Sequence, residues 1–511
     1  MRRHPALSGT PPEGVWLPIG IGTLLRLVQI WMPVLGVHSW RQADTAAMAR
    51  HFWQAGTPIW LPQIDWGGAS AGFVESEFPL YPYLVSWLYG LAGLHEWLAR
   101  GLSVVCSGLT IWLVIRLGRR WFGAEAGWWG GMAFAIAPLG VYFGRTVQAE
   151  ALLLLCAAAA LEGLSLWQQH HRLWAITLSW IGFTAAALIK VIPLLWLGLP
   201  LLMVQLTTDS EAPGSSCKSL VQRFIKLLQK PGFWLYIGTS LATVAAWYWY
   251  AHQLGQQSGL SFGFWGSGSD RSSLSLVLDG SSWGNLLLRI ALRLLAVVGV
   301  PFLVLGIRQS WNQASGSVAI SGLVGMLLCT LATMRSSTIH EYYQLPLLLF
   351  SSPLIGLGWS SWQRRQPRWQ PRALLSIGLI ISLTVLSVDY WAVEQRQSRA
   401  WMPLALTIRN ALPAEGRIVS ATSTDPTLLN LARRQGWLIS SKQLTPERIQ
   451  QWQGQGATHL AGSFVWDKTY RPMPLKRQQK LKALAAASRN GWIDERSQTY
   501  LIPLDGLPPQ F

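Results

Sequence analysis

The sequence predicts a mainly α-helical protein that crosses a membrane many times and carries a small soluble α/β domain at its C-terminal end. Of the 511 residues, 50% are hydrophobic and only 13% are charged, whereas soluble domains average about 25% charged residues. The hydrophobic residues also form blocks that approach ~20 residues with almost no charge, which is the length that a helix needs to cross a bilayer. After about residue 390, short apolar runs replace these blocks.

The hydrophobic blocks define about eleven predicted spans within residues 1–390. Lys and Arg cluster between them at 116–120, 218–230 and 364–372, and such clusters mark cytoplasmic loops. Because span one leaves the cytoplasm and the number of spans is odd, we expect the C-terminus to lie outside. The predicted spans cover 15–36, 99–117, 126–143, 148–167, 173–189, 192–206, 232–251, 286–306, 317–333, 344–361 and 373–390.

The basic excess and the cysteines argue against two other kinds of protein. The formal net charge is +18, but the cations lie in loops between spans and no aromatic-basic groove accompanies them, so we predict no nucleic-acid partner. The four cysteines form neither a disulfide framework nor a zinc-binding spacing.

Residues 391–511 are predicted to form the soluble domain, on the non-cytoplasmic side. A domain of this size is within the usual range, and it contains no glycine-rich phosphate-binding motif. The pattern does not predict what the domain does. Strand-like runs occur at 417–421, 437–440 and 500–503, and amphipathic helical patterns at 426–435, 445–453 and 476–488.

The loop that follows span one, residues 37–96, is external in this topology. Its stretch 78–93 is apolar, but no cluster of cations separates it from span two. We therefore predict a helix that lies at the membrane surface, where Trp and Tyr side chains are favoured.

This loop opens with His38-Ser-Trp-Arg-Gln-Ala-Asp-Thr45, which places Asp44 close to Arg41 and Gln42. A carboxylate kept ionised by a nearby cation can accept a proton from a nucleophile. The alternative interpretation is that Asp44 caps a helix over 45–52, because Asp is a favoured N-cap residue.

A second acidic motif, Glu75-Ser-Glu77-Phe-Pro-Leu-Tyr-Pro-Tyr83, lies later in the same loop. Glu77 is the candidate functional carboxylate here. The alternative is an ordinary helix start, with proline in the first turn and acidic residues near the positive end of the helix dipole.

Three further polar clusters lie at external ends of the predicted spans. They are Gly144-Arg-Thr-Val-Gln-Ala-Glu150, Lys190 followed by Pro193, and His340-Glu-Tyr-Tyr-Gln-Leu-Pro346 preceded by Arg335. Ionisable residues at this depth are costly and are functional candidates, although each alone could simply extend to the interface. Their convergence favours function, because Asp44, Glu77, Arg145, Lys190 and His340 all project from one face.

A carboxylate among cations at a membrane surface suits transfer of a sugar from a lipid phosphate. Cations stabilise the negative charge that develops on the leaving phosphate. A carboxylate on the opposite side of the anomeric carbon can deprotonate the acceptor hydroxyl. Such a reaction needs no nucleotide-sugar site, in agreement with the missing phosphate-binding loop.

The motifs W-R-Q-A-D-T, E-F-P-L-Y-P-Y-L, G-R-T-V-Q-A-E and H-E-Y-Y-Q-L-P resemble those of the GT-C superfamily of polyprenyl-phosphate-sugar glycosyltransferases. Within it, the chain is similar to glycosyltransferase family 39, the protein O-mannosyltransferases, and to the aminoarabinose transferases, over residues 15–390. The resemblance implies that Asp44 takes the place of the catalytic acidic residue of the first loop. Glu77-Phe78-Pro79-Leu80 looks like the family's acid-Lys-Pro-Pro-Leu stretch.

The sequence departs from that pattern at two positions. Thr45 follows Asp44 where many relatives have a paired Asp-Glu, and Phe78 stands where relatives can have a lysine that contacts phosphate. Another cation must then hold the phosphate, and Arg145, Lys190 and Arg335 are the candidates. Some relatives carry a metal near this loop. No metal or other cofactor is predicted here, although His38, His340 and Glu77 are the residues that could hold a divalent ion.

The leading hypothesis is an inverting glycosyltransferase in a bacterial inner membrane, acting at the periplasmic face on a polyprenyl-phosphate-sugar. The acceptor, a glycan, lipid or protein, is not predicted. The alternatives are an O-antigen ligase or polymerase, which usually has key arginines in a late loop, and a lipid or solute transporter, which Arg26, Arg289 and Arg293 would fit best. The hypothesis assigns catalysis to Asp44 and Glu77, donor binding to Arg41, Arg145, Lys190, Arg335, His340, Tyr342 and Tyr343, and acceptor or sugar contacts to Gln42, Gln148, Glu150 and Glu341.

Overall fold

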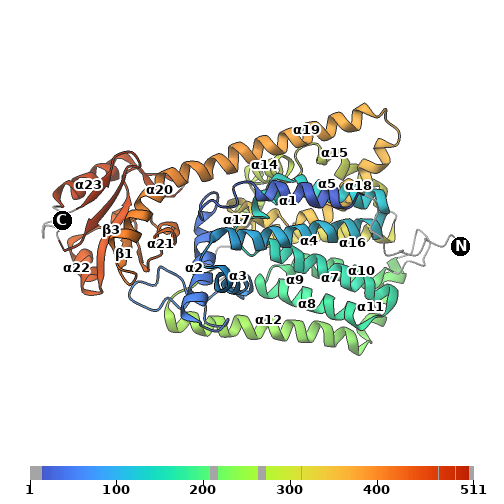
Figure 1. Ribbon diagram of the computed structural model, residues 1–511. Coiled ribbons are helices and arrows are strands. Elements are labelled where there is room, and N and C mark those ends of the chain that lie inside the picture. The colour runs from blue at the N-terminus through green and yellow to red at the C-terminus, as the bar shows by residue number, and fades with distance from the viewer. Residues whose placement is uncertain are drawn as a thin grey trace.

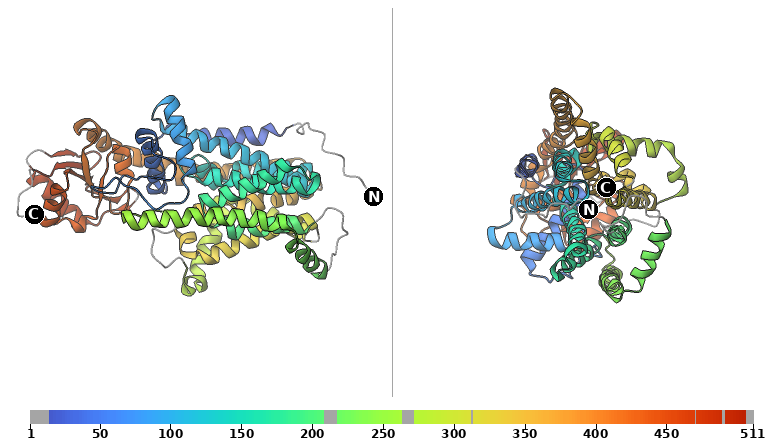
Figure 2. Two further views of the ribbon diagram at one scale, coloured as in Figure 1. Left: turned by 90° about the horizontal axis from the view of Figure 1, so that it is seen from below. Right: turned by 90° about the vertical axis from the view of Figure 1, so that its right-hand side faces the viewer.

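The computed structural model describes residues 14–207, 217–262, 272–311, 313–469, 471–488 and 491–505. It shows a bundle of long helices that lie side by side, with an α/β domain at one end (Figure 1). Figure 2 shows that α12 (Pro231–Ser258) runs along one side of this bundle. The predicted fold class, a helical membrane bundle followed by a small α/β domain, is confirmed.

Most predicted spans coincide with a helix or with a pair of consecutive helices, but the first, 15–36, is helical only over Trp16–Leu27. By length and composition, four helices qualify as membrane spans within the described residues: Glu96–Phe122, Glu150–His170, Ala314–Ala332 and Trp369–Ala411. Most of the other bundle helices are shorter or interrupted, whereas α12 is long enough, with 28 residues, but does not qualify by composition. These other helices are α1 (Trp16–Leu27), α5 (Ala124–Ile136), α6 (Pro138–Phe143), α8 (Leu173–Ile189), α9 (Pro193–Trp196), α10 (Gly198–Leu206), α12 and α18 (Leu347–Gln363).

The predicted span 286–306 is not one straight helix. Gly280–Leu294 and Gly299–Ser310 form a pair that is bent by 98°. The break contains Ala296 and Val297, both with positive φ angles of 47° and 60°, a conformation that is costly for residues with a Cβ. The apolar pattern of 286–306 does not predict this break, because hydropathy depends on the residue types and not on the direction of the backbone.

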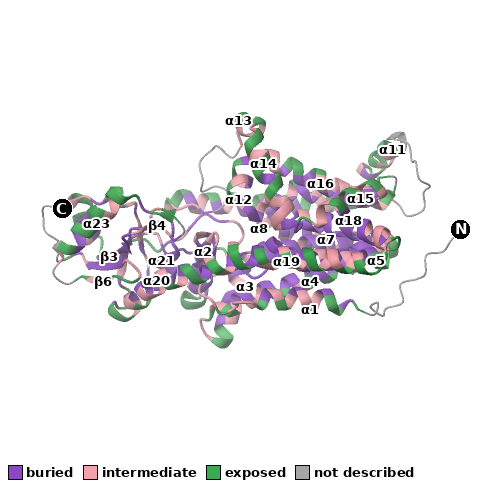
Figure 3. Cartoon of the chain, turned by 90° about the horizontal axis from the view of Figure 1, so that it is seen from above, coloured by how far each residue is buried: buried purple, intermediate pink, exposed green. Residues whose placement is uncertain are grey.

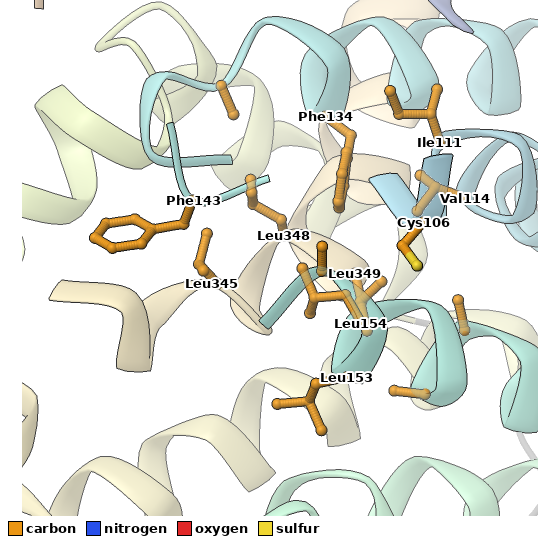
Figure 4. Packing of buried hydrophobic residues seen from close by; sticks show 14 of the residues in the cluster. Cys106, Ile111, Val114, Phe134, Phe143, Leu153, Leu154, Leu345, Leu348 and Leu349 are labelled. Carbon is orange, nitrogen blue, oxygen red and sulfur yellow. The ribbon is translucent and has the colours of Figure 1, made fainter. Parts of the chain in front are cut away.

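Small residues let the central helices approach closely. An added Cβ at Gly356 of α18 would lie 2.0 Å from the carbonyl oxygen of Ala126 in α5, and one at Gly118 of α4 (Glu96–Phe122) would lie 2.8 Å from Gly127. Close packing of this kind is a main source of helix association in membranes. Around it, Phe134, Leu154, Leu348 and other apolar side chains from α4, α5, α7 (Glu150–His170) and α18 fill the core (Figure 4).

Replacement of Gly356 by alanine should therefore destabilise the bundle. The new methyl group meets backbone that cannot rotate away, so we expect a loss of about 1–3 kcal/mol in unfolding free energy, as for other overpacked sites. The measurement is thermal or denaturant unfolding in detergent. Gly238→Ala in α12 is the matched control, because a Cβ there meets no atom within 4 Å. An equal loss in both variants would contradict the steric explanation.

The loop that was predicted to be external contains α2 (Ser39–Ala55) and α3 (Leu80–Ala92), and both lie at the end of the bundle that faces the α/β domain (Figure 1). The predicted surface helix 78–93 corresponds to α3. Asp44 is not an N-cap, because α2 begins at Ser39, after His38 adopts a left-handed conformation with φ 55°. The alternative interpretation of Asp44 is therefore wrong, and its side chain lies in the second turn of α2.

The α/β domain is built on a five-stranded sheet with the order β2-β1-β3-β7-β6. Strands β2 (Gly436–Leu438), β1 (Arg417–Ser420) and β3 (Ala457–Ser463) are parallel, and β7 (Thr499–Pro503) and β6 (Trp492–Asp494) continue antiparallel. The central strand β3 was not predicted from the sequence. Most of its residues, ATHLAGS, are small or polar and show no regular alternation of apolar and polar side chains. The helices are α21 (Thr427–Ala432), α22 (Pro446–Gly454) and α23 (Leu475–Ala487), and β4 (Trp466–Lys468) pairs with β5 (Arg471–Pro472).

One long helical segment joins the bundle to this domain. α19 (Trp369–Val385) continues through η3 (Leu386–Trp391) into α20 (Ala392–Ala411), so the expected boundary at 391 lies inside the segment. Trp401, Leu404 and Ile408 of α20 are fully buried in a core shared with the α/β domain. The domain is thus held against the end of the bundle, as the burial pattern in Figure 3 also shows.

Candidate active site

A cavity of ≈ 420 Å³ lies where the bundle meets the α/β domain. Helix α2, the first loop, the turn after α8 and the segment before α18 all contribute to its wall, together with the α/β domain. Seven of the predicted site residues line it: Arg41, Asp44, Glu77, Lys190, His340, Tyr342 and Tyr343. The fold therefore brings together side chains that are up to about 300 positions apart in the chain.

Asp44 is a carboxylate of this cavity that forms no ion pair with any of the described residues. Its Oδ1 accepts a hydrogen bond of 2.9 Å from Trp66 Nε1, and the residue is buried. Burial raises the pKa of the Asp44 carboxyl well above its ordinary value, although the Trp66 hydrogen bond and the Arg41 charge act in the opposite direction. A carboxylate with a raised pKa is a stronger base, as a proton acceptor near neutral pH requires.

Arg41, one turn before Asp44 on the same face of α2, forms an ion pair with Glu77. Its guanidinium also lies 4.1 Å from the centre of the Phe262 ring. Glu77 therefore lies in the cavity as the partner of a cation, and Arg41 is held in place by Glu77 and Phe262.

Lys190 follows α8, where the chain turns into extended backbone before α9. The ammonium group pairs with Glu150, the first residue of α7. It also lies 4.7 Å and 5.4 Å from the ring centres of Tyr342 and Tyr343. An anion that enters the cavity would meet a cation already oriented by one carboxylate and two aromatic faces.

His340 and His38 lie edge to face, with ring centres 5.3 Å apart. Burial lowers the pKa of His340 to about 3, assisted by His38 and Arg41. It lowers the pKa of His38 to about 4, assisted by Arg289. Both imidazoles are therefore neutral near pH 7 and can donate or accept hydrogen bonds.

A metal site at His38, His340 and Glu77 does not form in the described part of the chain, where no three His, Cys, Asp or Glu side chains are grouped to hold an ion. Glu77 is committed to Arg41 instead. The residues present therefore do not fit a metal.

Several predicted residues do not line the cavity. Arg145 is fully buried and pairs with Glu394 at 2.6 Å, so the structure does not place it as a phosphate ligand. Glu341 pairs with Arg293 at 2.6 Å. Arg335 also lies outside the lining, in the first turn of α17 (Met334–Ile339).

The remaining predicted contacts support the cavity wall from behind. Gln42 Oε1 accepts a hydrogen bond of 3.2 Å from the backbone N–H of Val147. Gln148 is buried beside Thr146, and Glu150 orients Lys190. They join the motif G-R-T-V-Q-A-E to α2 and do not face the cavity.

Sequence reasoning missed part of the lining. Trp66 and Phe262, which contact Asp44 and Arg41, come from loops without a recognisable motif. The α/β domain contributes Ser423, Thr424 and Leu438. Ser423 has a left-handed φ of 59°, and its N–H bonds to the Ile439 carbonyl at 2.7 Å. The remaining residues of the lining are Trp40, Ser261, Thr333 and Ser336.

A buried hydrogen-bond network ties the α/β domain to Ser39, the first residue of α2 and five positions before Asp44. Ser39 Oγ lies 3.0 Å from Thr427 Oγ1 and 2.9 Å from Thr469 Oγ1. Asp425 accepts from the Thr427 N–H at 2.9 Å and from the Thr469 hydroxyl at 2.7 Å. The position of the domain is therefore coupled to the helix that carries the candidate base.

Comparison with known proteins agrees with this architecture. Residues 76–249 match the family model of dolichyl-phosphate-mannose-protein mannosyltransferases. No curated protein sequence matches the chain.

Among solved structures, the chain is similar to ArnT from Cupriavidus metallidurans bound to undecaprenyl phosphate, with a TM-score of 0.64, 15% identity, and 96% and 98% of the two chains covered. It is also similar to the Archaeoglobus fulgidus oligosaccharyltransferase, with a TM-score of 0.53, 12% identity, and 88% and 69% covered. The archaeal oligosaccharyltransferase AglB from Archaeoglobus fulgidus, in complex with an inhibitory peptide and a dolichol-phosphate, is similar with a TM-score of 0.51, 10% identity, and 88% and 69% of the two chains covered.

Proposed function

From the premise that this chain has the fold of the GT-C glycosyltransferases, we propose that it transfers a sugar from a polyprenyl-phosphate-linked donor to an acceptor hydroxyl. The observation that carries the proposal is the single cavity that holds Asp44, Arg41 and Lys190. It combines a buried carboxylate of raised pKa with two cations, and this is the set of groups that the reaction requires.

In this mechanism Asp44 is the general base. It removes the proton from the acceptor hydroxyl as that oxygen attacks the anomeric carbon, and the bond from this carbon to the phosphate oxygen breaks. The electron pair leaves with the lipid phosphate, and the configuration of the sugar inverts. Trp66 orients the Asp44 carboxylate through Oδ1, which leaves Oδ2 for the acceptor.

Arg41 and Lys190 stabilise the leaving phosphate. Each is already paired with a carboxylate, Glu77 or Glu150, so the cations are fixed in position before the donor arrives. Preorganised charges of this kind lower the barrier because they need no rearrangement during the reaction. Tyr342 and Tyr343 flank Lys190 and complete the wall against which the donor would lie.

We place the cavity at the non-cytoplasmic face, in a bacterial inner membrane. Arg119 and Arg120 lie in the last turn of α4, at the end of the bundle remote from the cavity (Figure 1). Cation-rich ends face the cytoplasm, so the cavity and the α/β domain face the other side.

The test is a transfer assay with the purified full-length protein in proteoliposomes. Polyprenyl-phosphate-linked hexoses and pentoses are supplied with candidate lipid, glycan and peptide acceptors, and both the product and the released polyprenyl phosphate are measured. We expect equal amounts of product and released lipid phosphate. Release of no lipid phosphate from any donor, together with movement of lipid or solute across the vesicle, would show a transporter instead.

A further inference from the structure

Three arginines in or beside the spans, Arg26, Arg289 and Arg293, have no role in the proposed reaction. They lie in two different environments. Arg26 is fully buried, and it donates to the carbonyl oxygens of Gly22 at 2.8 Å, Ala135 at 3.1 Å and Gly140 at 2.9 Å. Its contacts are internal and join α1 to α5 and α6. Arg289 and Arg293, by contrast, line a second cavity of ≈ 340 Å³.

This second cavity lies at the bent pair of helices, beside the main cavity. Its polar residues are Ser282, Asn285, Arg289 and Arg293 of α14 (Gly280–Arg289) and η1 (Ile290–Leu294), and Thr338 of α17. Ser336 of α17 lines the main cavity. The short helix α17 therefore contributes to the walls of both cavities.

The two arginines of the second cavity, Arg293 and Arg289, have different kinds of partner. Arg293 pairs with Glu341 at 2.6 Å and with Asp389 at 3.0 Å. Arg289 donates to the carbonyl oxygens of Ser337 and Thr338, at 3.1 Å and 2.9 Å. Within the described part of the chain no carboxylate pairs with Arg289, so its positive charge is available to an anion.

The surroundings of the cavity are apolar and exposed. Leu274 and Leu278 of α13 (Leu274–Leu278) are each 74% exposed, and Leu287 and Leu288 of α14 are 60% and 65% exposed. These two helices project sideways from the bundle (Figure 3). In a protein that spans a membrane, such side chains contact lipid.

The polar residues and the exposed leucines of α14 lie on different faces of the helix. Ser282, Asn285 and Arg289 are three and four positions apart and therefore share one face of the helix, whereas Leu287 lies on another. A lipid could place its phosphate against the polar face while its chains follow the exposed leucines.

We propose that Arg289 and Arg293, with Ser282, Asn285 and Thr338, form a second site that binds the phosphate group of a membrane lipid. Arg289 is the principal ligand, since a guanidinium offers several N–H groups to phosphate oxygens. This inference does not depend on the proposed sugar transfer. The lipid phosphate could come from a polyprenyl phosphate on its way to the main cavity or from an anionic phospholipid, and the experiment distinguishes the two.

The experiment measures lipid binding by native mass spectrometry of the full chain in detergent. The probes are undecaprenyl phosphate, phosphatidylglycerol and the net-neutral phosphatidylcholine. The variants are Arg289→Gln, Arg289→Lys and, as a matched control, Arg308→Gln in the last turn of α15 (Gly299–Ser310), at the other end of the bent pair. Melting temperatures of all variants establish that they are folded.

We expect Arg289→Gln to weaken binding of at least one anionic lipid about tenfold or more, as loss of charge-assisted hydrogen bonds predicts. Arg289→Lys should restore part of it, and Arg308→Gln and phosphatidylcholine should show no change. A loss confined to undecaprenyl phosphate would identify a donor entry site, and a loss confined to phosphatidylglycerol would identify a phospholipid site. Unchanged binding of both anionic lipids in Arg289→Gln would overturn the proposal. So would an equal loss in Arg308→Gln.

If Arg289→Gln does not fold, Arg289→Lys and salt provide the test. Binding to a partly exposed cation such as Arg289 weakens as ionic strength rises. Undiminished binding of both anionic lipids by the wild type at high salt, with no difference between the wild type and Arg289→Lys, would then reject the site. Failure of the transfer assay would not affect this result, because the binding measurement requires no turnover.

Discussion

The Asp44→Asn variant is expected to fold like the wild type and to lose sugar transfer almost completely. A general base contributes about 10²–10⁴-fold to a rate, so we expect kcat to fall by that factor with little change in donor affinity. The asparagine oxygen can still accept the Trp66 hydrogen bond that Asp44 Oδ1 receives. What disappears is the ability to take a proton from the acceptor.

The pH profile provides a second measurement at the same residue. Because burial raises the pKa of Asp44 above its ordinary value, the wild-type rate should fall as the pH decreases through that raised pKa, where the base becomes protonated. The residual activity of the Asp44→Asn variant should not show this decrease at low pH. His340 and His38 have pKa values of about 3 and about 4, so they add no transition near neutral pH.

Stability helps to separate catalysis from folding. A carboxyl group whose pKa is raised in the folded state favours the protonated form, so above its unfolded pKa the buried charge opposes folding. The Asn variant should accordingly be at least as stable as the wild type at pH 7. Glu125→Gln in the first turn of α5 is the control for loss of a carboxylate elsewhere. Full transfer by a folded Asp44→Asn variant would exclude Asp44 as the base.

The Glu394→Gln variant is expected to show the largest loss of stability. Glu394 in α20 is fully buried and lies between Arg145, at 2.6 Å, and Arg100, at 3.5 Å. Removal of its charge leaves two buried guanidinium groups without a counterion. Breaking a buried ion pair in this way typically costs about 3–5 kcal/mol, and glutamine keeps nearly the same volume, so packing is not the cause.

Denaturant unfolding in detergent measures this effect, with Glu415→Gln as the exposed control. Addition of Arg145→Met to Glu394→Gln should recover part of the loss, because it removes one uncompensated charge. A loss below about 1 kcal/mol, the usual value for exposed ion pairs, would show that the cluster does not hold α20 in place. In that case the hydrogen bond of 2.7 Å from the Gly36 N–H to Gln397 Oε1 would be a more important link.

The Glu394 prediction shows how differently sequence and structure assign Arg145. By resemblance and by its position in G-R-T-V-Q-A-E, Arg145 was a candidate phosphate ligand. The structure gives it a carboxylate partner 249 positions away in the chain, a distance over which no local pattern can act. Lys190 and Arg41, equally plausible from sequence, are the cations that reach the cavity.

The sequence by itself determined the membrane bundle, the α/β domain that follows it and the polar motifs, because hydropathy, charge placement and short-range spacing are local properties. The resemblance to GT-C glycosyltransferases could also be recognised from the motifs in four separate segments. It is confirmed by the family match and the fold.

Only the tertiary structure decided which charges are paired, where the bundle helix breaks at Ala296 and Val297, and how the α/β domain completes the cavity through Ser423, Thr424 and Leu438. Each of these depends on contacts between residues far apart in the chain. The free energy of a buried charge is set by the partner that folding brings to it, and neither composition nor periodicity carries that information.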